Sequence, residues 1–215
     1  LEAFRDLAQR ARAVLCVTLP ARLSSLYQTA RVAADTFRRE RPDIEVRVVD
    51  SGTVAMAQGF VALAAARAAR AGEGLEGAVQ AAQAVVSRVR LVAVLDTVHY
   101  LAKGGRIAWT TAWVASLLSV KPVVEVAQGE VRPTGPVRSR ASGIERMLNY
   151  MAEHAGQRPV HVGIMHGNVP QEAERLRARV LERFRCVEVL VNELTPVMGM
   201  YAGPGALGLA FYPEE

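Results

Sequence analysis

Short apolar strands alternate with amphipathic helices at the start of this 215-residue chain, and this order restricts the fold more than any single motif. AVLCVTL (13–19) is a nearly continuous apolar run, and IEVRVVD (44–50) reads as the next strand. Between them a helix is predicted from about Ser24. Its helical repeat consists of Leu26, Ala30, Ala33 and Phe37. Strands that alternate with full helices pair in parallel through right-handed crossovers, so the sequence predicts an α/β layer.

Two further helices are predicted before residue 90. Asp50 and Ser51 are good helix caps, so an Ala-rich helix is expected from about Thr53 to a stop at Gly72. A following helix has a single apolar stripe, formed by Leu75, Val79, Ala82, Val86 and Val89. We therefore expect residues 1–90 to form a parallel α/β domain.

The pattern changes after about residue 90. LVAVLD (91–96) predicts a strand, and VKPVVEVAQGEVRP (120–133) predicts an antiparallel hairpin that turns at Gln128 and Gly129. Further elements are expected as helices near 138–155 and 170–184, strands near 160–166 and 186–191, and a closing apolar run at 206–211. We expect residues 91–215 to form a second, α+β domain with an antiparallel sheet.

Composition favours a soluble, globular, cytoplasmic protein. The hydrophobic content of 51% is ample for a core. No apolar run reaches the roughly 20 residues that a bilayer requires, so no integral membrane segment is expected. The Arg-bearing start does not resemble a signal peptide. Cys16 and Cys186 lie far apart in apolar runs, which favours buried free thiols over a disulfide or a metal site.

The charge pattern argues against a nucleic-acid partner. The net charge is +5, and Lys103 and Lys121 are the two lysines among 26 basic residues. Arginines at 175–185 share a predicted helix with glutamates, which indicates a solvated face of mixed charge. A nucleic-acid surface would be one-sidedly basic and interleaved with aromatic residues.

Two glycine clusters mark the candidate site. In YLAKGGRIA (100–108), Gly104 and Gly105 can end a short helix in a positive-φ turn that swings Arg106 back across it, before Ile107 re-enters the core. In VMGMYAGPGALGLAF, a Gly-Pro-Gly sequence makes a tight corner that lets the backbone approach a neighbour. Glycines in such places usually shape a site.

Several polar residues favour an anionic ligand. Ser24 and Ser25 lie where a strand gives way to a helix. Their hydroxyls and the free backbone N–H groups there could hold a carboxylate or phosphate, or could simply cap the helix. Arg106 in its glycine turn and Lys121 after a strand-like run are candidate cationic partners, although each alone could be a surface cation.

Other motifs do not fit their usual context. The glycines at 203–208 spell GxGxxG but do not open a helix inside a βαβ unit, so a dinucleotide site is rejected. The four histidines lack ligand spacing, so no metal is expected, and no cofactor is indicated. Trp109 and Trp113 are interpreted as core or interface residues, and Asp96 as the cap of the next helix.

Together the residues resemble the DegV family, bacterial fatty-acid-binding proteins that include the acyl-carrier subunits of fatty acid kinase. The resemblance spans the whole chain and keeps the order of six motifs. These are LSSLY (23–27), VVDSG (48–52), YLAKGGRI (100–107), LLSVKPVV (117–124), VRSR (137–140) and GPGALG (203–208). The resemblance implies a two-domain fold, a parallel α/β domain beside an antiparallel α+β domain, with one long-chain fatty acid clamped between them.

The resemblance also assigns roles to residues. Ser24 matches the family serine that hydrogen-bonds the fatty acid carboxylate, with Ser25 and Leu26 in place of the usual glycine and threonine. Arg106 matches the arginine of the Gly-Gly-Arg-Ile motif. Arg138 matches a basic position suited to docking the kinase partner.

The segment before Gly-Pro-Gly departs from the family pattern. Tyr201 and Ala202 precede Gly203, where family members often have histidine and threonine. A tyrosine hydroxyl can still donate to a carboxylate, but it cannot carry a charge near neutral pH. The chain also begins at Leu1 without the family's opening Asp-Ser strand and its later Thr-Ser segment, so an N-terminal portion is expected to be missing.

The resemblance therefore implies a monomeric carrier without catalytic residues, which presents the fatty acid carboxylate to an ATP-dependent kinase subunit for acyl phosphate formation and phospholipid synthesis. About 14 buried methylenes at roughly 0.8 kcal/mol each offer on the order of 11 kcal/mol before ordering and association costs. The alternative is a small hydrolase or phosphotransferase that uses Ser24 with a basic partner. Its weakness is that no histidine lies close to Ser24 in the sequence.

Overall fold

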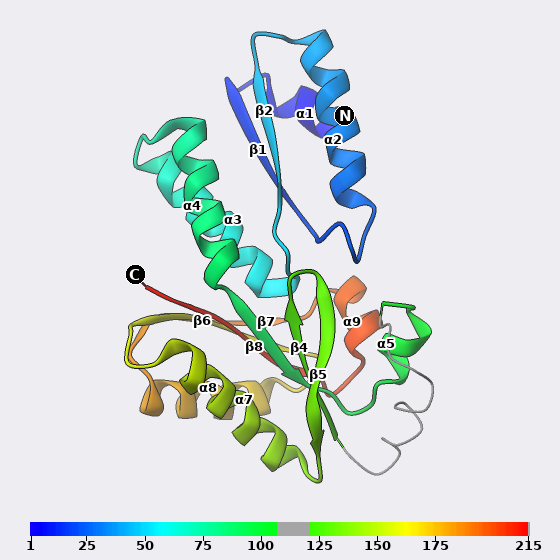
Figure 1. Ribbon diagram of the computed structural model, residues 1–215, viewed down its shortest axis with the longest axis vertical. Coiled ribbons are helices and arrows are strands. Elements are labelled where there is room, and N and C mark those ends of the chain that lie inside the picture. Colours follow the sequence, from blue (N-terminus) through cyan, green and yellow to red (C-terminus); the bar gives the residue numbers. More distant parts are fainter. Residues whose placement is uncertain (107–120, 215) are drawn as a thin grey trace. The chain divides into compact units, whose positions relative to one another are not determined.

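The computed structural model of the protein describes residues 1–106 and 121–214, which divide into two compact units (Figure 1). The first unit comprises Leu1–Val54 and Gln58–Arg88, and the second comprises Ala55–Ala57 and the chain from Val89 onward.

The first unit is built on a two-stranded parallel sheet. β1 (Ala13–Thr18) pairs with β2 (Glu45–Asp50), so that both strands end at the same edge. The helices are α1 (Glu2–Leu7), α2 (Leu26–Glu40), α3 (Ala55–Arg70) and α4 (Gly74–Arg88). The parallel pairing predicted from the alternation of strands and helices is confirmed, whereas α1 was not predicted.

The core of the first unit lies between its sheet, α1 and α2. The Phe37 ring is fully buried, and its centroid lies 6.1 Å from that of Phe4. Val46 of β2 packs in the same cluster. The expected apolar stripe of α2 is wrong at its first position, because Leu26 is 52% exposed. This residue begins the helix, beyond the buried face that runs through Ala34 and Phe37.

The second unit is built on a six-stranded sheet in the order β5-β4-β3-β8-β6-β7. Its strands are β3 (Arg90–Val94), β4 (Lys121–Ala127), β5 (Glu130–Val137), β6 (Val160–His166), β7 (Cys186–Glu193) and β8 (Leu207–Pro213). Neighbouring strands are antiparallel except for β6 and β7. α8 (Pro170–Arg183) connects that pair as a crossover, so the sheet is mixed where we expected it to be antiparallel.

Helices α7 (Arg140–Ala155) and α8 cover one face of this sheet (Figure 1). Met147 and Leu148 of α7 and Leu176 of α8 are buried against Ile164 and Leu209 of the central strands. The predicted closing strand is thus β8, which lies between β3 and β6.

The predicted hairpin is confirmed. β4 and β5 are antiparallel and turn at Gln128 and Gly129, whose φ angles are 52° and 74°. Positive φ at both central residues gives the turn a twist that matches the strands. Two short helices, α5 (His99–Lys103) and α9 (Pro196–Ala202), also belong to this unit and contact each other. Within the described residues, no helix is long and apolar enough to span a bilayer.

Candidate functional site

Ser24 and Ser25 lie in the loop between β1 and α2. The Ser24 hydroxyl oxygen accepts a hydrogen bond of 3.2 Å from the backbone N–H of Leu26, while Ser25 is the N-cap residue without a side-chain cap bond. Ser24 is half-buried and Ser25 is exposed. Because a hydroxyl both donates and accepts, this bond still allows the Ser24 O–H to donate to an anion. The hydrogen bond to Leu26 and ligand binding are therefore compatible at Ser24.

Asp50 joins this loop to the end of β2. Its carboxylate accepts hydrogen bonds from the backbone N–H of Ala21 at 3.0 Å and of Gly52 at 2.8 Å. The expectation that Asp50 caps α3 is therefore wrong. Gly52, with a φ of 63°, turns the chain first, and α3 begins only at Ala55. Asp50 thus ties together the loops that follow both strands of the first unit.

Ser51 does not cap α3 either, because the N-cap of that helix is Val54. The Ser51 hydroxyl donates to the Thr53 carbonyl at 2.9 Å and accepts from the Thr53 N–H at 3.3 Å. Both side chains are buried, and the Thr53 hydroxyl has no hydrogen-bond partner. The VVDSG motif therefore forms a compact turn rather than a helix start.

The first glycine cluster has the predicted local structure. α5 ends at Lys103, Gly104 is its C-cap, and Gly105 has a φ of 67°. The turn brings Arg106 back, so that its Nη1 donates a hydrogen bond of 2.7 Å to the Gly104 carbonyl oxygen. The predictions for Ile107, Trp109 and Trp113 lie outside the described residues, as does the 117–120 part of the LLSVKPVV motif.

The second glycine cluster packs onto the first through aromatic rings. A Cβ atom on Gly104 would lie 2.5 Å from Cδ1 of Tyr201, and one on Gly203 would lie 2.4 Å from Cδ2 of Tyr100. Each of the helices α5 and α9 therefore sets a tyrosine ring directly against a glycine of the other segment. The Arg106 guanidinium carbon lies 5.3 Å from the centroid of the Tyr201 ring. The Gly-Gly-Arg turn and the end of α9 form one cluster.

The Gly-Pro-Gly corner also approaches other segments closely, as predicted. Gly203 and Gly205 have φ angles of 76° and 78°, and the Gly205 N–H donates to the Gly167 carbonyl at 2.8 Å. A Cβ atom on Gly205 would lie 2.1 Å from a carboxylate oxygen of Asp96. Glycine is required here by close packing as well as by backbone conformation.

Asp96 has a role that the sequence analysis missed. It does not cap α5, because the side chain that accepts from the backbone N–H of His99 is that of Thr97. The Asp96 carboxylate instead pairs with Lys121 at 2.9 Å and with Arg140 at 3.2 Å. Lys121, a candidate cationic partner of the ligand, is therefore already paired within the protein.

The VRSR segment divides into an exposed and an engaged arginine. Arg138 is exposed beyond the end of β5. Arg140, at the start of α7, pairs with Glu172 of α8 as well as with Asp96. Its Nη2 atom is buried without a hydrogen-bond partner. Of these two arginines, Arg138 is the exposed one.

The predicted site residues thus form separate sets. Arg106, Tyr201, Ala202 and Gly203 lie together in the second unit, with Ala202 the last residue of α9 and Gly203 its C-cap. Ser24 and Ser25 belong to the first unit. Arg138 lies in the second unit, beyond the end of β5.

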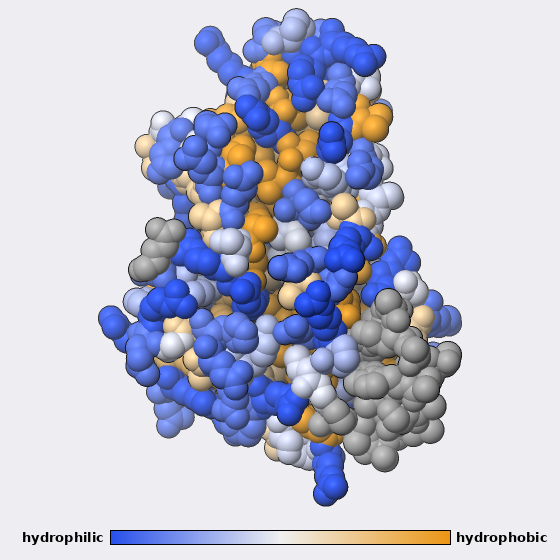
Figure 2. All heavy atoms as spheres, viewed as in Figure 1, coloured by the Kyte–Doolittle hydropathy of each residue, from blue (hydrophilic) through white to orange (hydrophobic). Residues whose placement is uncertain are grey.

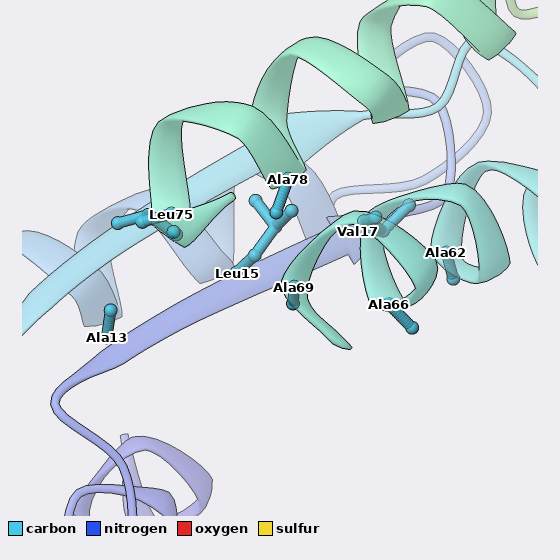
Figure 3. A pocket seen from close by; sticks show the side chains of 10 residues that line it. Ala13, Leu15, Val17, Ala62, Ala66, Ala69, Leu75 and Ala78 are labelled. Atoms are coloured by element: carbon cyan, nitrogen blue, oxygen red, sulfur yellow. The ribbon is translucent and has the colours of Figure 1, made fainter. Parts of the chain in front are cut away.

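A groove that the sequence analysis did not predict lies inside the first unit, between β1 and the helices α3 and α4 (Figure 3). Its volume is about 470 Å³, and apolar side chains gather on the face of this unit seen in Figure 2. The lining consists of Ala13, Leu15, Val17, Ala62, Ala65, Ala66, Ala69, Gly74, Leu75 and Ala78. The alanines of α3 recur at helical spacing, which is the sequence signal that could have indicated this groove. Its lining has no cation for a carboxylate.

The cysteines and histidines form no metal site in the part of the chain that the structure describes. Cys16 and Cys186 are half-buried free thiols, and burial raises the pKa of each. A raised pKa keeps a thiol in its less reactive protonated form near neutral pH.

Comparisons with known proteins cover nearly the whole chain. The family model described as "Uncharacterised protein, DegV family COG1307" matches residues 1–214. A DegV domain-containing protein of Streptomyces coelicolor is 37% identical over 210 residues, which are 97% of this chain and 73% of that protein.

Solved structures of similar fold include fatty-acid-binding proteins. A Thermus thermophilus protein, described by its fatty acid binding, superposes with a TM-score of 0.90 at 27% identity and covers 99% of this chain and 75% of its own. A fatty acid binding protein of Bacillus subtilis superposes with a TM-score of 0.86 at 25% identity, over 99% of this chain and 75% of its own. These similarities confirm the predicted fold class.

Proposed function

Because this chain belongs to the DegV family, we propose that it binds a long-chain fatty acid and carries it for a separate kinase. The observation that carries the proposal is the similarity, at a TM-score of 0.90 over 99% of the chain, to a protein described as binding fatty acid. In this proposal the protein is a monomeric, cytoplasmic carrier without catalytic residues.

The head group is proposed to be held by a few of the motif residues and by the two residues that precede Gly-Pro-Gly. Ser24 and Ser25 would donate hydrogen bonds to the carboxylate, and Arg106 would supply positive charge. Tyr201 and the backbone at 202–203 would complete the contacts. A buried carboxylate needs such charge-assisted or hydroxyl hydrogen bonds to offset several kcal/mol of desolvation.

Native mass spectrometry of the protein after mild purification tests the proposed ligand. We expect a co-purified long-chain fatty acid, or uptake of added oleate or palmitate at one molecule per chain. A protein that is empty and also ignores both added fatty acids would contradict the proposal.

The anchoring role of Ser24 can be measured by titrating a fluorescent fatty acid. Ser24→Ala should weaken binding by about 1 to 3 kcal/mol, the usual cost of a charged acceptor that loses a donor. Thr36→Val in α2 is a matched control, because that hydroxyl donates to the Val32 carbonyl of its own helix. A double variant of Ser24 and Arg106 tests whether one ligand uses both residues, since losses for a shared ligand atom are not additive.

Arg138 is proposed to dock the kinase subunit. Arg138→Ala should leave the fatty acid affinity nearly unchanged and should slow acyl phosphate formation when kinase and ATP are added, most at low salt. Arg132→Ala is the control, because Arg132 is an exposed arginine of β5, the strand that ends just before Arg138, and pairs with Glu130 at 2.6 Å. A loss of fatty acid binding in Arg138→Ala as large as that in Ser24→Ala would contradict this division of roles.

Turnover by the purified protein alone tests the carrier proposal against the enzymatic alternative. We expect no hydrolysis of acyl esters or acyl phosphates without the kinase. Hydrolysis that disappears in Ser24→Ala would favour the hydrolase over the carrier.

A further inference from the structure

We propose that the ring of Tyr201, rather than its hydroxyl, holds the guanidinium of Arg106 in the orientation that binds an anionic head group. Tyr201 would then be a positioning residue that acts through Arg106. This inference rests on the proposed function, because the anion is the head group of the fatty acid.

Among the described residues, Gly104 and Tyr201 both hold Arg106. Its guanidinium carbon lies 5.3 Å from the centroid of the Tyr201 ring, within the range at which a ring attracts a cation over its face. Its Nη1 donates to the Gly104 carbonyl at 2.7 Å. A planar group that rests over a ring and is hydrogen-bonded at one corner has little freedom to turn. The orientation of an otherwise exposed arginine is thereby restricted.

The ring that supports Arg106 is itself fixed. A Cβ atom on Gly104 would lie 2.5 Å from Cδ1 and 2.6 Å from Cε1 of Tyr201, so the ring lies flush against this glycine. Tyr201 is also half-buried against the cluster formed by Leu95, Leu101 and Val124. Gly104 therefore packs against the Tyr201 ring and also provides the carbonyl oxygen that accepts the hydrogen bond from Arg106.

Prior ordering of Arg106 favours binding. An arginine side chain loses rotamer entropy when it is immobilised. A side chain that is already ordered in the free protein avoids part of this cost when the ligand binds. A phenol cannot gain a positive charge, so the charge that meets the anion is that of Arg106, and the ring sets where this charge lies.

The test compares Tyr201→Phe with Tyr201→Leu, first without ligand. The Arg106 Nε–Hε resonance, assigned with Arg106→Lys in ¹⁵N-labelled protein, should show an upfield ring-current shift in the wild type. The shift should remain in Tyr201→Phe and be lost in Tyr201→Leu. A shift that survives in Tyr201→Leu would overturn the proposed contact.

Fluorescent fatty acid titrations then measure the consequence for binding. Tyr201→Phe should bind within about 2-fold of the wild type, whereas Tyr201→Leu should bind about 2- to 5-fold more weakly, the value of an exposed cation–π contact. Arg106→Lys should also bind more weakly although it keeps the charge, because an ammonium lacks the planar fork that stacks on a ring. Equal losses in Tyr201→Phe and Tyr201→Leu would assign the role to the hydroxyl and overturn the proposal.

Tyr100→Leu controls for packing. Tyr100 sets its ring against Gly203 in the reciprocal contact of the same two segments. Its replacement should lower the melting temperature about as much as Tyr201→Leu while it preserves the Arg106 shift and the affinity. A wild-type protein that ignores both palmitate and oleate would contradict the proposed function. The Arg106 resonance would still decide the contact with Tyr201, because it is read without ligand.

Discussion

Two regions of the molecule are organised in different ways. The serine loop of the first unit comprises the turns at Ser24 and Ser51, and the glycine corner of the second comprises the turns at Gly104–Gly105 and Gly203–Gly205. The Ser24 and Ser51 hydroxyls each accept a hydrogen bond from the backbone N–H two residues further along the chain, which belongs to Leu26 and Thr53 respectively. Around Gly104 and Gly205, the contacts join segments far apart in the sequence, such as α5 with α9. The first consists mainly of local turns, which the bond from the Ala21 N–H to Asp50 joins, whereas the second is an assembly of distant segments.

This difference teaches where substitutions should be costly. A local turn that loses one hydrogen bond can often form another bond with water, so its loss is modest. A glycine that is packed against a ring or a carboxylate has no such substitute, because an added methyl group must displace a neighbour. We therefore expect the glycine corner to be more sensitive than the serine loop, and four substitutions can sharpen or break this comparison.

Gly205→Ala should have the largest effect. The new methyl group would lie 2.1 Å from the Asp96 carboxylate, at a φ of 78° that alanine adopts only with strain. We expect the free energy of unfolding to fall by about 3 kcal/mol or more in denaturant titrations. Gly199→Ala in α9 is the control, because an added Cβ meets nothing within 4 Å and alanine favours a helix. Similar losses in both variants would break the comparison.

Gly104→Ala should come next, with a loss of about 1 to 3 kcal/mol from overpacking. The φ of Gly104 is −72°, so its cost would come from contact with Tyr201 and not from the backbone. Gly105→Ala is the opposite case, because its cost would come from the backbone alone. Gly105 has a φ of 67°, and an added Cβ would meet nothing within 4 Å. Tyr201→Leu should partly rescue Gly104→Ala in thermal denaturation, and strictly additive losses would mean that the ring is not the obstacle.

Asp50→Ala should cost about 1 to 2 kcal/mol, because it removes the acceptor of two backbone N–H groups. These belong to Ala21 and Gly52, on different loops of the first unit. Hydrogen exchange should show faster exchange at both amides, with less change in Asp50→Asn, which retains an acceptor oxygen. Unchanged exchange at Ala21 would show that Asp50 does not connect the loops.

Ser24→Ala should have the smallest effect on stability, about 1 kcal/mol or less, as for the loss of one exposed hydrogen bond. Its effect on fatty acid binding should exceed its effect on unfolding. Denaturant titration and ligand titration of the same preparation would measure both. A loss of stability as large as that of Gly205→Ala would reverse the order proposed for the two regions.

The sequence predicted those elements whose signals are local. The Gln128–Gly129 hairpin, the end of α5 at Gly104 and the parallel pair β1–β2 were all predicted from turn residues and periodicity, and the structure confirms them. Two helix-cap predictions failed because the carboxylate took a distant partner. Asp50 and Asp96 each preceded a predicted helix, and neither caps one.

The sequence by itself determined which segments become strands, helices and glycine turns, because periodicity and backbone preference act over a few residues. Only the tertiary structure decided that Asp96 pairs with Lys121 and Arg140, and that the Tyr201 ring contacts both Gly104 and Arg106. Ion pairs and ring contacts depend on which distant segments the sheet brings together. Which segments come together depends on burial of the whole core. The sequence around Asp96 or Tyr201 therefore carries no local pattern that predicts these contacts.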